Sequence, residues 1–389
     1  MKHLPVLIII LTGLFINFCG KNSNSISPSA EALETLRVIQ TEHGPVNVIT
    51  IASGLEHPWS LESLPEGPML VTERAGRLRS VSTDGRLSEP IKGVPEVFAR
   101  GQGGLLDVII DPDFKSNRFI YMSYAAPGKN GAYTAAARGR LSKDLTEISG
   151  LQVIFRQEPG VSGAAHFGSR LAFARDGTLF ITLGERFKFD PAQDLTNHLG
   201  KIVRINSDGS IPDDNPFSGR NDVKPEIWSY GHRNVQGAAL HPETGELWTH
   251  ELGPKGGDAL NIPKPGLNYG WPLVSFGRHY TGINIPDPPT KPELPQPIYH
   301  WTPAVSPSGM TFYTGNLFTE WKGNILMGGL ASRLLVRLTL KGNSVTGEER
   351  INMGARIREV HQGANGEIYL LTDSSDGKIL QLTPGYIDL

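Results

Sequence analysis

The segment Asp176-Gly-Thr-Leu-Phe-Ile-Thr182 puts an Asp-Gly turn directly before a short run of residues that favour β-strands. A turn followed by such a run occurs at six places along the chain. Their central residues lie 50, 60, 68, 78 and 43 residues apart, which suits four-stranded sheets joined by loops of variable length. The six segments are 67–72, 117–123, 176–182, 244–249, 322–327 and 365–371, with Met69, Phe119, Leu179, Leu247, Ile325 and Ile368 as equivalent points.

A further β-type run follows several of these segments and predicts the return strand of a hairpin. No stretch shows sustained helical periodicity, and 45 glycines and 29 prolines among 389 residues favour frequent turns. We therefore expect an all-β fold, a six-bladed β-propeller with a central channel, and a pair of β-sandwiches is the alternative. The predicted return strands are 76–81, 200–205, 334–340 and 377–383.

The charge balance argues against a nucleic-acid partner. There are 37 Lys and Arg residues against 39 Asp and Glu residues, a net charge of −2, and no basic run provides the patch that nucleic-acid binding requires. A hydrophobic content of 39% with 20% charged residues is typical of a soluble globular protein.

The N-terminal residues predict export. Residues 1–19 read as a signal peptide, because a basic start precedes the apolar run 6–16, which is too short to span a bilayer. The segment is similar to a bacterial lipoprotein signal that ends in a lipidated Cys19; cleavage without lipidation is the alternative, since Phe18 stands where such signals have a small residue. We expect a polar linker over 20–35, the propeller over 36–389, and a periplasmic or membrane-anchored location. Cys19 is the only cysteine, which excludes an intrachain disulfide.

Two segments combine a histidine or arginine with small residues just before a predicted strand. They are 163–170 and 230–237, and in a propeller such loops meet at one mouth of the channel. His166 is a candidate general base, because imidazole titrates near neutral pH, and a hydrogen-bonded structural histidine is the alternative. No Walker loop, dinucleotide fingerprint, Gly-x-Ser-x-Gly or His-Glu-x-x-His motif occurs.

Arginines and a glycine-rich loop provide candidate ligand-binding groups. Arg233, Arg356 and Arg358 can pair with carboxylate or phosphate. Because one residue separates Arg356 from Arg358, both side chains lie on the same face of a strand. A solvated strand face is the alternative for these two arginines. The loop 253–258 can offer carbonyl oxygens to a hard cation such as Ca²⁺, or it is an ordinary turn.

Ten segments, taken in order, resemble the family of soluble quinoprotein glucose dehydrogenases and aldose sugar dehydrogenases, which are six-bladed propellers that bind pyrroloquinoline quinone (PQQ) and Ca²⁺. The resemblance covers roughly residues 54–384. The segments are 54–60, 71–78, 101–107, 166–170, 192–195, 230–234, 268–272, 306–310, 356–358 and 371–373.

The resemblance implies that His166 takes the proton of the anomeric hydroxyl of an aldose while hydride passes from C1 to the quinone, so that an aldonolactone forms. It also implies that the main-chain carbonyls of Gly253 and Pro254 bind Ca²⁺. The positions that match residues around PQQ are Gln102, Arg233, Asn234, Tyr280, Leu330, Ala331, Arg356 and Arg358.

Two positions depart from the family pattern. Ala331 stands where some relatives have a lysine beside the cofactor, and Arg333 is the nearest substitute. Ala259 stands where some relatives have an acidic residue that, with a tyrosine matching Tyr269, binds a second Ca²⁺; Asp258 is the nearest substitute.

We therefore expect a PQQ- and Ca²⁺-dependent aldose dehydrogenase whose partners are the sugar and an external electron acceptor, a quinone or a cytochrome. An inactive exported propeller that binds sugar or protein is the alternative. A Ca²⁺-dependent lactonase would need a carboxylate-rich cage, and the sequence offers no such cluster. Substrate choice is expected to depend on the loops 206–224 and 274–297.

Overall fold

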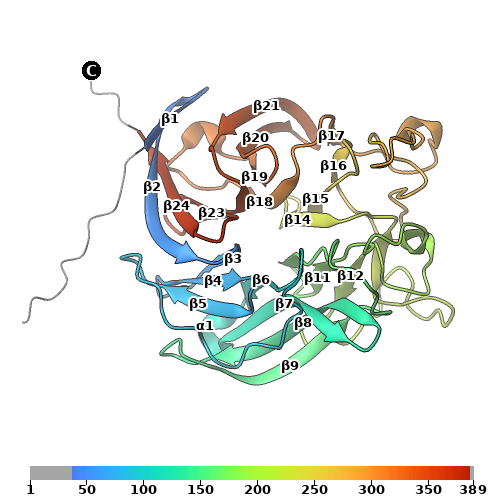
Figure 1. Cartoon of the computed structure of the whole chain (residues 1–389), viewed down its shortest axis with the longest axis horizontal. Coiled ribbons are helices and arrows are strands. Elements are labelled where there is room, and N and C mark those ends of the chain that lie inside the picture. The colour runs from blue at the N-terminus through green and yellow to red at the C-terminus, as the bar shows by residue number, and fades with distance from the viewer. Residues whose placement is uncertain (1–36, 386–389) are drawn as a thin grey trace, which may run out of the picture. The chain divides into compact units, whose positions relative to one another are not determined.

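The computed structural model describes residues 37–385, which form six antiparallel sheets arranged in a ring (Figure 1). This confirms the all-β, six-bladed propeller. The expected signal peptide, Cys19 and the linker lie outside the described residues. In the first three sheets along the chain, the strands are β3 (Pro58–Ser63), β4 (Met69–Glu73) and β5 (Arg77–Val81); β6 (Leu105–Ile110), β7 (Phe119–Gly128), β8 (Gly131–Leu141) and β9 (Ile148–Arg156); and β10 (Leu171–Phe173), β11 (Leu179–Thr182), β12 (Lys201–Ile205) and β13 (Ile227–Tyr230).

The other three sheets complete the ring. Their strands are β14 (Val235–Leu240), β15 (Leu247–Glu251), β16 (Asp258–Asn261) and β17 (Tyr299–Trp301); β18 (Pro307–Phe312), β19 (Ile325–Gly329), β20 (Leu334–Lys341) and β21 (Ser344–Asn352); and β22 (Ile357–Gln362), β23 (Ile368–Thr372) and β24 (Gly377–Pro384), joined by β1 (Arg37–Thr41) and β2 (Gly44–Leu55). Helical structure is confined to α1 (Phe114–Asn117) and three short 3₁₀ turns, and none of these described helices is long and apolar enough to cross a membrane.

The ring is closed by a strand from the start of the described chain. Strand β2 pairs with β24, so that Val48 lies opposite Leu382 and Leu55 lies opposite Gly377. In Figure 1 the blue β2 runs beside the red β24. This pairing covers the edge that β24 would otherwise expose, which is the usual reason for closing a sheet ring.

The repeated sequence pattern marks the second strand of every sheet. The equivalent points fall within β4, β7, β11, β15, β19 and β23, and the four predicted return strands correspond to β5, β12, β20 and β24. Residues 206–224 form a loop between β12 and β13, as expected. Apolar side chains fill the space between neighbouring sheets; Trp248 and Trp301 from one sheet, for example, share a buried cluster with Met310 and Ile325 from the next.

The first strand of each sheet lies next to the axis of the ring. Strands β3, β6, β10, β14, β18 and β22 each contact the next one around the ring. In all of these except β10, the pairing register with the second strand shifts near the start of the first strand. Such bulges re-aim side chains at a sheet end, and here they lie at one end of the channel.

Candidate active site

A cavity of about 440 Å³, called here the central cavity, opens at this end of the channel. Because the strands are antiparallel, each first strand starts where its second strand ends, and the lining residues come from these two places in the sheets. They are His57, Trp59, Arg74, Gln102, Leu106, Phe167, Gly168, Asn234, Gln236, Leu252, Ser306, Leu330, Arg356, Arg358 and Asp373.

His166 lies beside this cavity, directly before the lining residues Phe167 and Gly168. Its side chain is buried, and its Nδ1 lies 2.5 Å from Oε1 of the buried Glu185. The other oxygen of Glu185 accepts the backbone N–H groups of Lys188 and Phe189. With Nδ1 donating to the carboxylate, Nε2 of His166 keeps its lone pair, which is the form that a general base needs.

The electrostatic surroundings favour the neutral imidazole. Burial is the main cause that lowers the pKa of His166; the bond to Glu185 opposes it, and the charge of Arg233 adds to the lowering. Burial alone would raise the pKa of Glu185. The hydrogen bond from His166, the charges of His166 and Arg233 and the backbone N–H of Phe189 together outweigh burial and hold that pKa below its ordinary value. A neutral histidine paired with an ionised glutamate can accept a proton at neutral pH.

The backbone around this pair has an unusual conformation. Five non-glycine residues between 166 and 189 have positive φ, among them His166 at 55° and Phe187 at 58°. Phe187 stacks on the imidazole of His166 with ring centroids 4.0 Å apart. Such strained residues persist where the surrounding contacts hold them, and they often mark functional sites. The backbone N–H of His166 donates to Oε1 of Gln102 at 2.7 Å, so His166 is hydrogen-bonded to a residue that lines the central cavity.

The central cavity has a cationic side. Arg356 donates to Oδ2 of Asp373 at 2.8 Å, Arg358 lies 3.5 Å from the same oxygen, and Nδ1 of His57 lies 3.0 Å from Oδ1. The two arginines and His57 outweigh burial, which would raise the pKa of Asp373, and they hold that pKa far below its usual range. Burial lowers the pKa of Arg358 to about 10, so it stays charged at neutral pH. With Arg74, three arginines and one carboxylate line the cavity.

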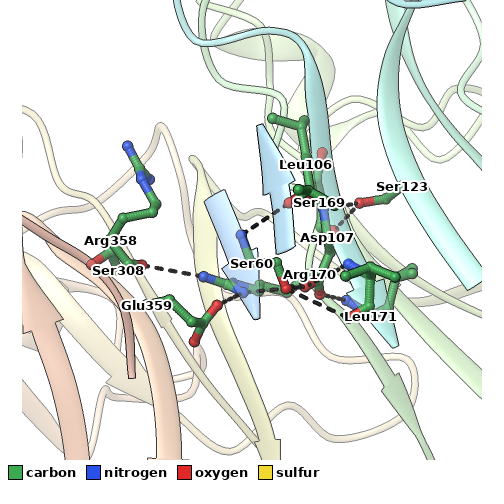
Figure 2. Close-up of polar contacts among 12 residues, drawn as sticks. Ser60, Leu106, Asp107, Ser123, Ser169, Arg170, Leu171, Ser308, Arg358 and Glu359 are labelled. Atoms are coloured by element: carbon green, nitrogen blue, oxygen red, sulfur yellow. Dashed lines mark hydrogen bonds and ion pairs between the residues drawn. The ribbon is translucent and has the colours of Figure 1, made fainter. Parts of the chain in front are cut away.

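A buried ionic network centred on Arg170 joins residues of the inner strands of different sheets (Figure 2). Arg170 bonds both Asp107 on β6 and Glu359 on β22, and its Cζ lies 4.1 Å from the ring centroid of Trp59. Burial raises the pKa of Glu359 to about 7, against the attraction of Arg170. Arg170 also donates to the carbonyl of Arg358 at 3.4 Å, so the network supports the cationic side.

Arg233 lines a second cavity of about 300 Å³, called here the aromatic cavity. Its Nη1 donates to the carbonyls of Leu252 at 2.9 Å and Gly253 at 2.6 Å. The aromatic cavity is lined by Phe187, Phe189, Arg233, Pro254, His279, Tyr280, Thr281 and Ile283, most of which come from the expected specificity loop 274–297 and the 186–189 segment. The other expected specificity loop, 206–224, adds no residue to either cavity.

The residues expected to bind Ca²⁺ lie near Arg233. The carbonyl of Gly253 already accepts Arg233, and the hydroxyl of Tyr269 donates to Ile262 and accepts the backbone N–H of Lys264. No group of three or more His, Cys, Asp or Glu side chains within residues 37–385 is arranged to hold a metal ion. Since Ca²⁺ takes six to eight oxygens, Gly253 and Pro254 can supply only part of its shell, and the rest must come from other oxygen ligands.

The arginines fit an anionic cofactor. Among the described residues, the Nε groups of Arg74, Arg233 and Arg358 are buried without a hydrogen-bond acceptor. Leaving buried charged donors unpaired is costly, so these positions favour a ligand that brings carboxylates. PQQ, with three carboxylates, meets this requirement.

The structure brings most of the predicted site residues together. Gln102, Asn234, Leu330, Arg356 and Arg358 line the central cavity, and Tyr280 and Pro254 line the aromatic cavity. Ala331 and Arg333 are exposed and do not line the central cavity. Sequence reasoning missed Glu185, Arg74, His57 and Asp373. Three of these follow the second strands β11, β4 and β23, so a charged residue shortly after these three predicted strands was the available signal.

The chain is similar to known sugar dehydrogenases. The Glucose / Sorbosone dehydrogenase family model matches residues 55–381. Aldose sugar dehydrogenase YliI of Escherichia coli is 44% identical and aligns over 87% of this chain and 93% of its own length. Quinoprotein glucose dehydrogenase B of Acinetobacter calcoaceticus is 27% identical over 84% of this chain and 85% of its own. The PQQ-bound structure of aldose sugar dehydrogenase from Streptomyces coelicolor has a TM-score of 0.70 and 28% identity, covering 87% of this chain and 98% of the other.

Proposed function

Because the chain belongs to the Glucose / Sorbosone dehydrogenase family, we propose that it is a PQQ- and Ca²⁺-dependent dehydrogenase that oxidises aldoses at C1 to aldonolactones. The observation that carries this proposal is the pairing of a His–Glu base with an arginine-rich cavity in one channel mouth. A PQQ-bound relative and a quinoprotein relative support the choice of cofactor.

The proposed roles follow from the contacts. His166 takes the proton of the C1 hydroxyl at Nε2, while Glu185 stabilises the imidazolium that forms. Arg356 and Arg358 hold cofactor carboxylates, and Gln102 and Asn234 lie on the same cavity wall. When bound, PQQ would supply a quinone that accepts the hydride from C1. The carbonyls of Gly253 and Pro254 would hold Ca²⁺.

The wider roles are also proposals. An external quinone or cytochrome would reoxidise the cofactor, and export with lipid attachment through Cys19 would put the reaction outside the cytoplasm. Tyr280 and Tyr269 would lie near the cofactor and a second Ca²⁺, although both hydrogen-bonding roles of the Tyr269 hydroxyl are already used within the chain.

The test is a reconstitution of the purified protein with PQQ and Ca²⁺, separately and together, followed by a panel of aldoses and an artificial dye. Dye reduction that needs both additions supports the proposal. PQQ binding without turnover of any aldose, or no PQQ binding at all, would instead favour a propeller that only binds sugar or protein.

The role of His166 has its own test. His166→Ala should abolish turnover, because it removes the proposed proton acceptor, but should keep PQQ binding, because His166 does not line the central cavity. Substantial residual activity in this variant contradicts the assigned role.

A further inference from the structure

Arg74 is an arginine of the central cavity that the sequence did not single out. It directly follows β4, and its Nη1 donates to the carbonyl of Gly101 at 2.5 Å. Its own carbonyl lies against Gly104, where a Cβ would come within 2.1 Å of it. Gly104 has a φ of +145°, so only glycine suits this close approach. The 101–104 loop thus holds Arg74 at the cavity wall.

The charge of Arg74 has no partner in the described chain. Arg356 and Arg358 both reach Asp373, whereas no carboxylate in residues 37–385 lies within salt-bridge distance of Arg74. Its Nε is also buried without a hydrogen-bond acceptor. Burial is the main cause that lowers the pKa of Arg358, and the positive charge of Arg74 adds to this lowering, so the two guanidinium groups lie close enough to repel each other.

A half-buried guanidinium with a buried, unpaired donor is unfavourable unless a ligand pairs with it. Arg356 and Arg358 are partly neutralised by Asp373, which leaves Arg74 as the cation of the cavity with the most unsatisfied charge. A carboxylate in the cavity could pair with the charge of the Arg74 guanidinium.

We propose that Arg74 is a further cofactor-binding residue, which pairs with a carboxylate of the ligand. Arg74 lies near the start of the described sequence, whereas Arg356 and Arg358 lie near its end, and all three line the same cavity. This inference rests on the proposed function, since PQQ supplies the carboxylates. Some relatives have a lysine beside the cofactor where this chain has the exposed Ala331. Arg74 would then supply a cationic contact with the cofactor that Ala331 cannot make.

The experiment is a titration of the full-length apo-protein with PQQ, followed by quenching of tryptophan fluorescence, because Trp59 lines the same cavity. Arg74→Gln should weaken PQQ binding by roughly 10- to 100-fold, the effect of losing a hydrogen bond to a charged group. Arg74→Lys, which keeps the charge but not the Nε donor, should weaken it less. The control is Arg100→Gln, which removes an exposed arginine that does not line the cavity.

The outcomes separate this inference from the proposed function. If the wild-type protein binds PQQ and Arg74→Gln binds it equally well, the role of Arg74 is refuted while the proposed function stands. If the wild-type protein does not bind PQQ, both are refuted. Thermal melting of each variant identifies a folding defect, and if Arg74→Gln does not fold, wild-type affinity in a folded Arg74→Lys refutes pairing through the Arg74 guanidinium.

Discussion

The substitution Glu185→Gln should disable the general base by changing its tautomer. In the native site, Oε2 of Glu185 accepts two backbone N–H groups and Oε1 accepts Nδ1–H of His166. A glutamine must turn its single oxygen toward the two backbone donors, because its NH₂ group would otherwise face them. The NH₂ group then donates to Nδ1, so that the proton of the imidazole moves to Nε2, where the lone pair is needed.

The expected loss of kcat is large because the imidazole of His166 then has no lone pair at Nε2 to accept the proton. A wrong tautomer in a comparable His–carboxylate pair costs about 10³–10⁴ in kcat. This corresponds to about 4–5.5 kcal/mol of activation free energy. Binding of PQQ should change little, since Glu185 does not line the central cavity.

The assay is steady-state dye reduction by the reconstituted enzyme, with PQQ affinity measured in parallel. A matched control is Glu226→Gln, which makes the same change in a second His–Glu pair, 2.6 Å from Nε2 of His198 and outside both cavities. This control should keep wild-type kcat. A kcat for Glu185→Gln within a few-fold of wild type would refute the tautomer argument.

Two further predictions concern stability. Arg170→Met should destabilise the protein by about 3–5 kcal/mol in urea unfolding, because Asp107 and Glu359 lose their buried cation; adding Glu359→Gln should recover part of this loss, and strict additivity would contradict the network. Burial lowers the pKa of His250 to about 3 from 6.5, and its Nε2 bonds the carbonyl of Ser308. The unfolded chain therefore binds more protons between these values, and stability falls as the pH drops below about 6.5, by about 1.4 kcal/mol per pH unit. His250→Gln should remove this contribution to the slope between pH 7 and 5, and an unchanged slope would rule it out.

The number of sheets could be predicted from the sequence because the turn-plus-strand pattern is local. A short apolar run after a turn marks a buried second strand. Met69, Leu179 and Ile368 are buried residues of the second strands β4, β11 and β23. The ring closure by β2 could not be read in the same way, since strand pairing across more than 300 residues leaves no local pattern.

The base and the arginines were candidates from their residue chemistry and took their specific roles from the resemblance, whereas their partners were not predicted. Glu185 and Asp373 are two of 39 acidic residues, and only the fold shows that the ends of the strands they follow meet at the channel mouth. The bond between Arg233 and the Gly253 carbonyl depends on side-chain conformation, which spacing does not specify.

The closure of the ring has a consequence for biosynthesis. His57 and Asp373 form one contact in the cavity wall although 316 residues separate them, and β2 pairs with β24 at the end of the chain. During synthesis, His57 therefore leaves the ribosome long before Asp373 is added to the chain. A prematurely terminated chain lacks Asp373 and the partner of β2, so only a fully synthesised chain can form the complete central cavity.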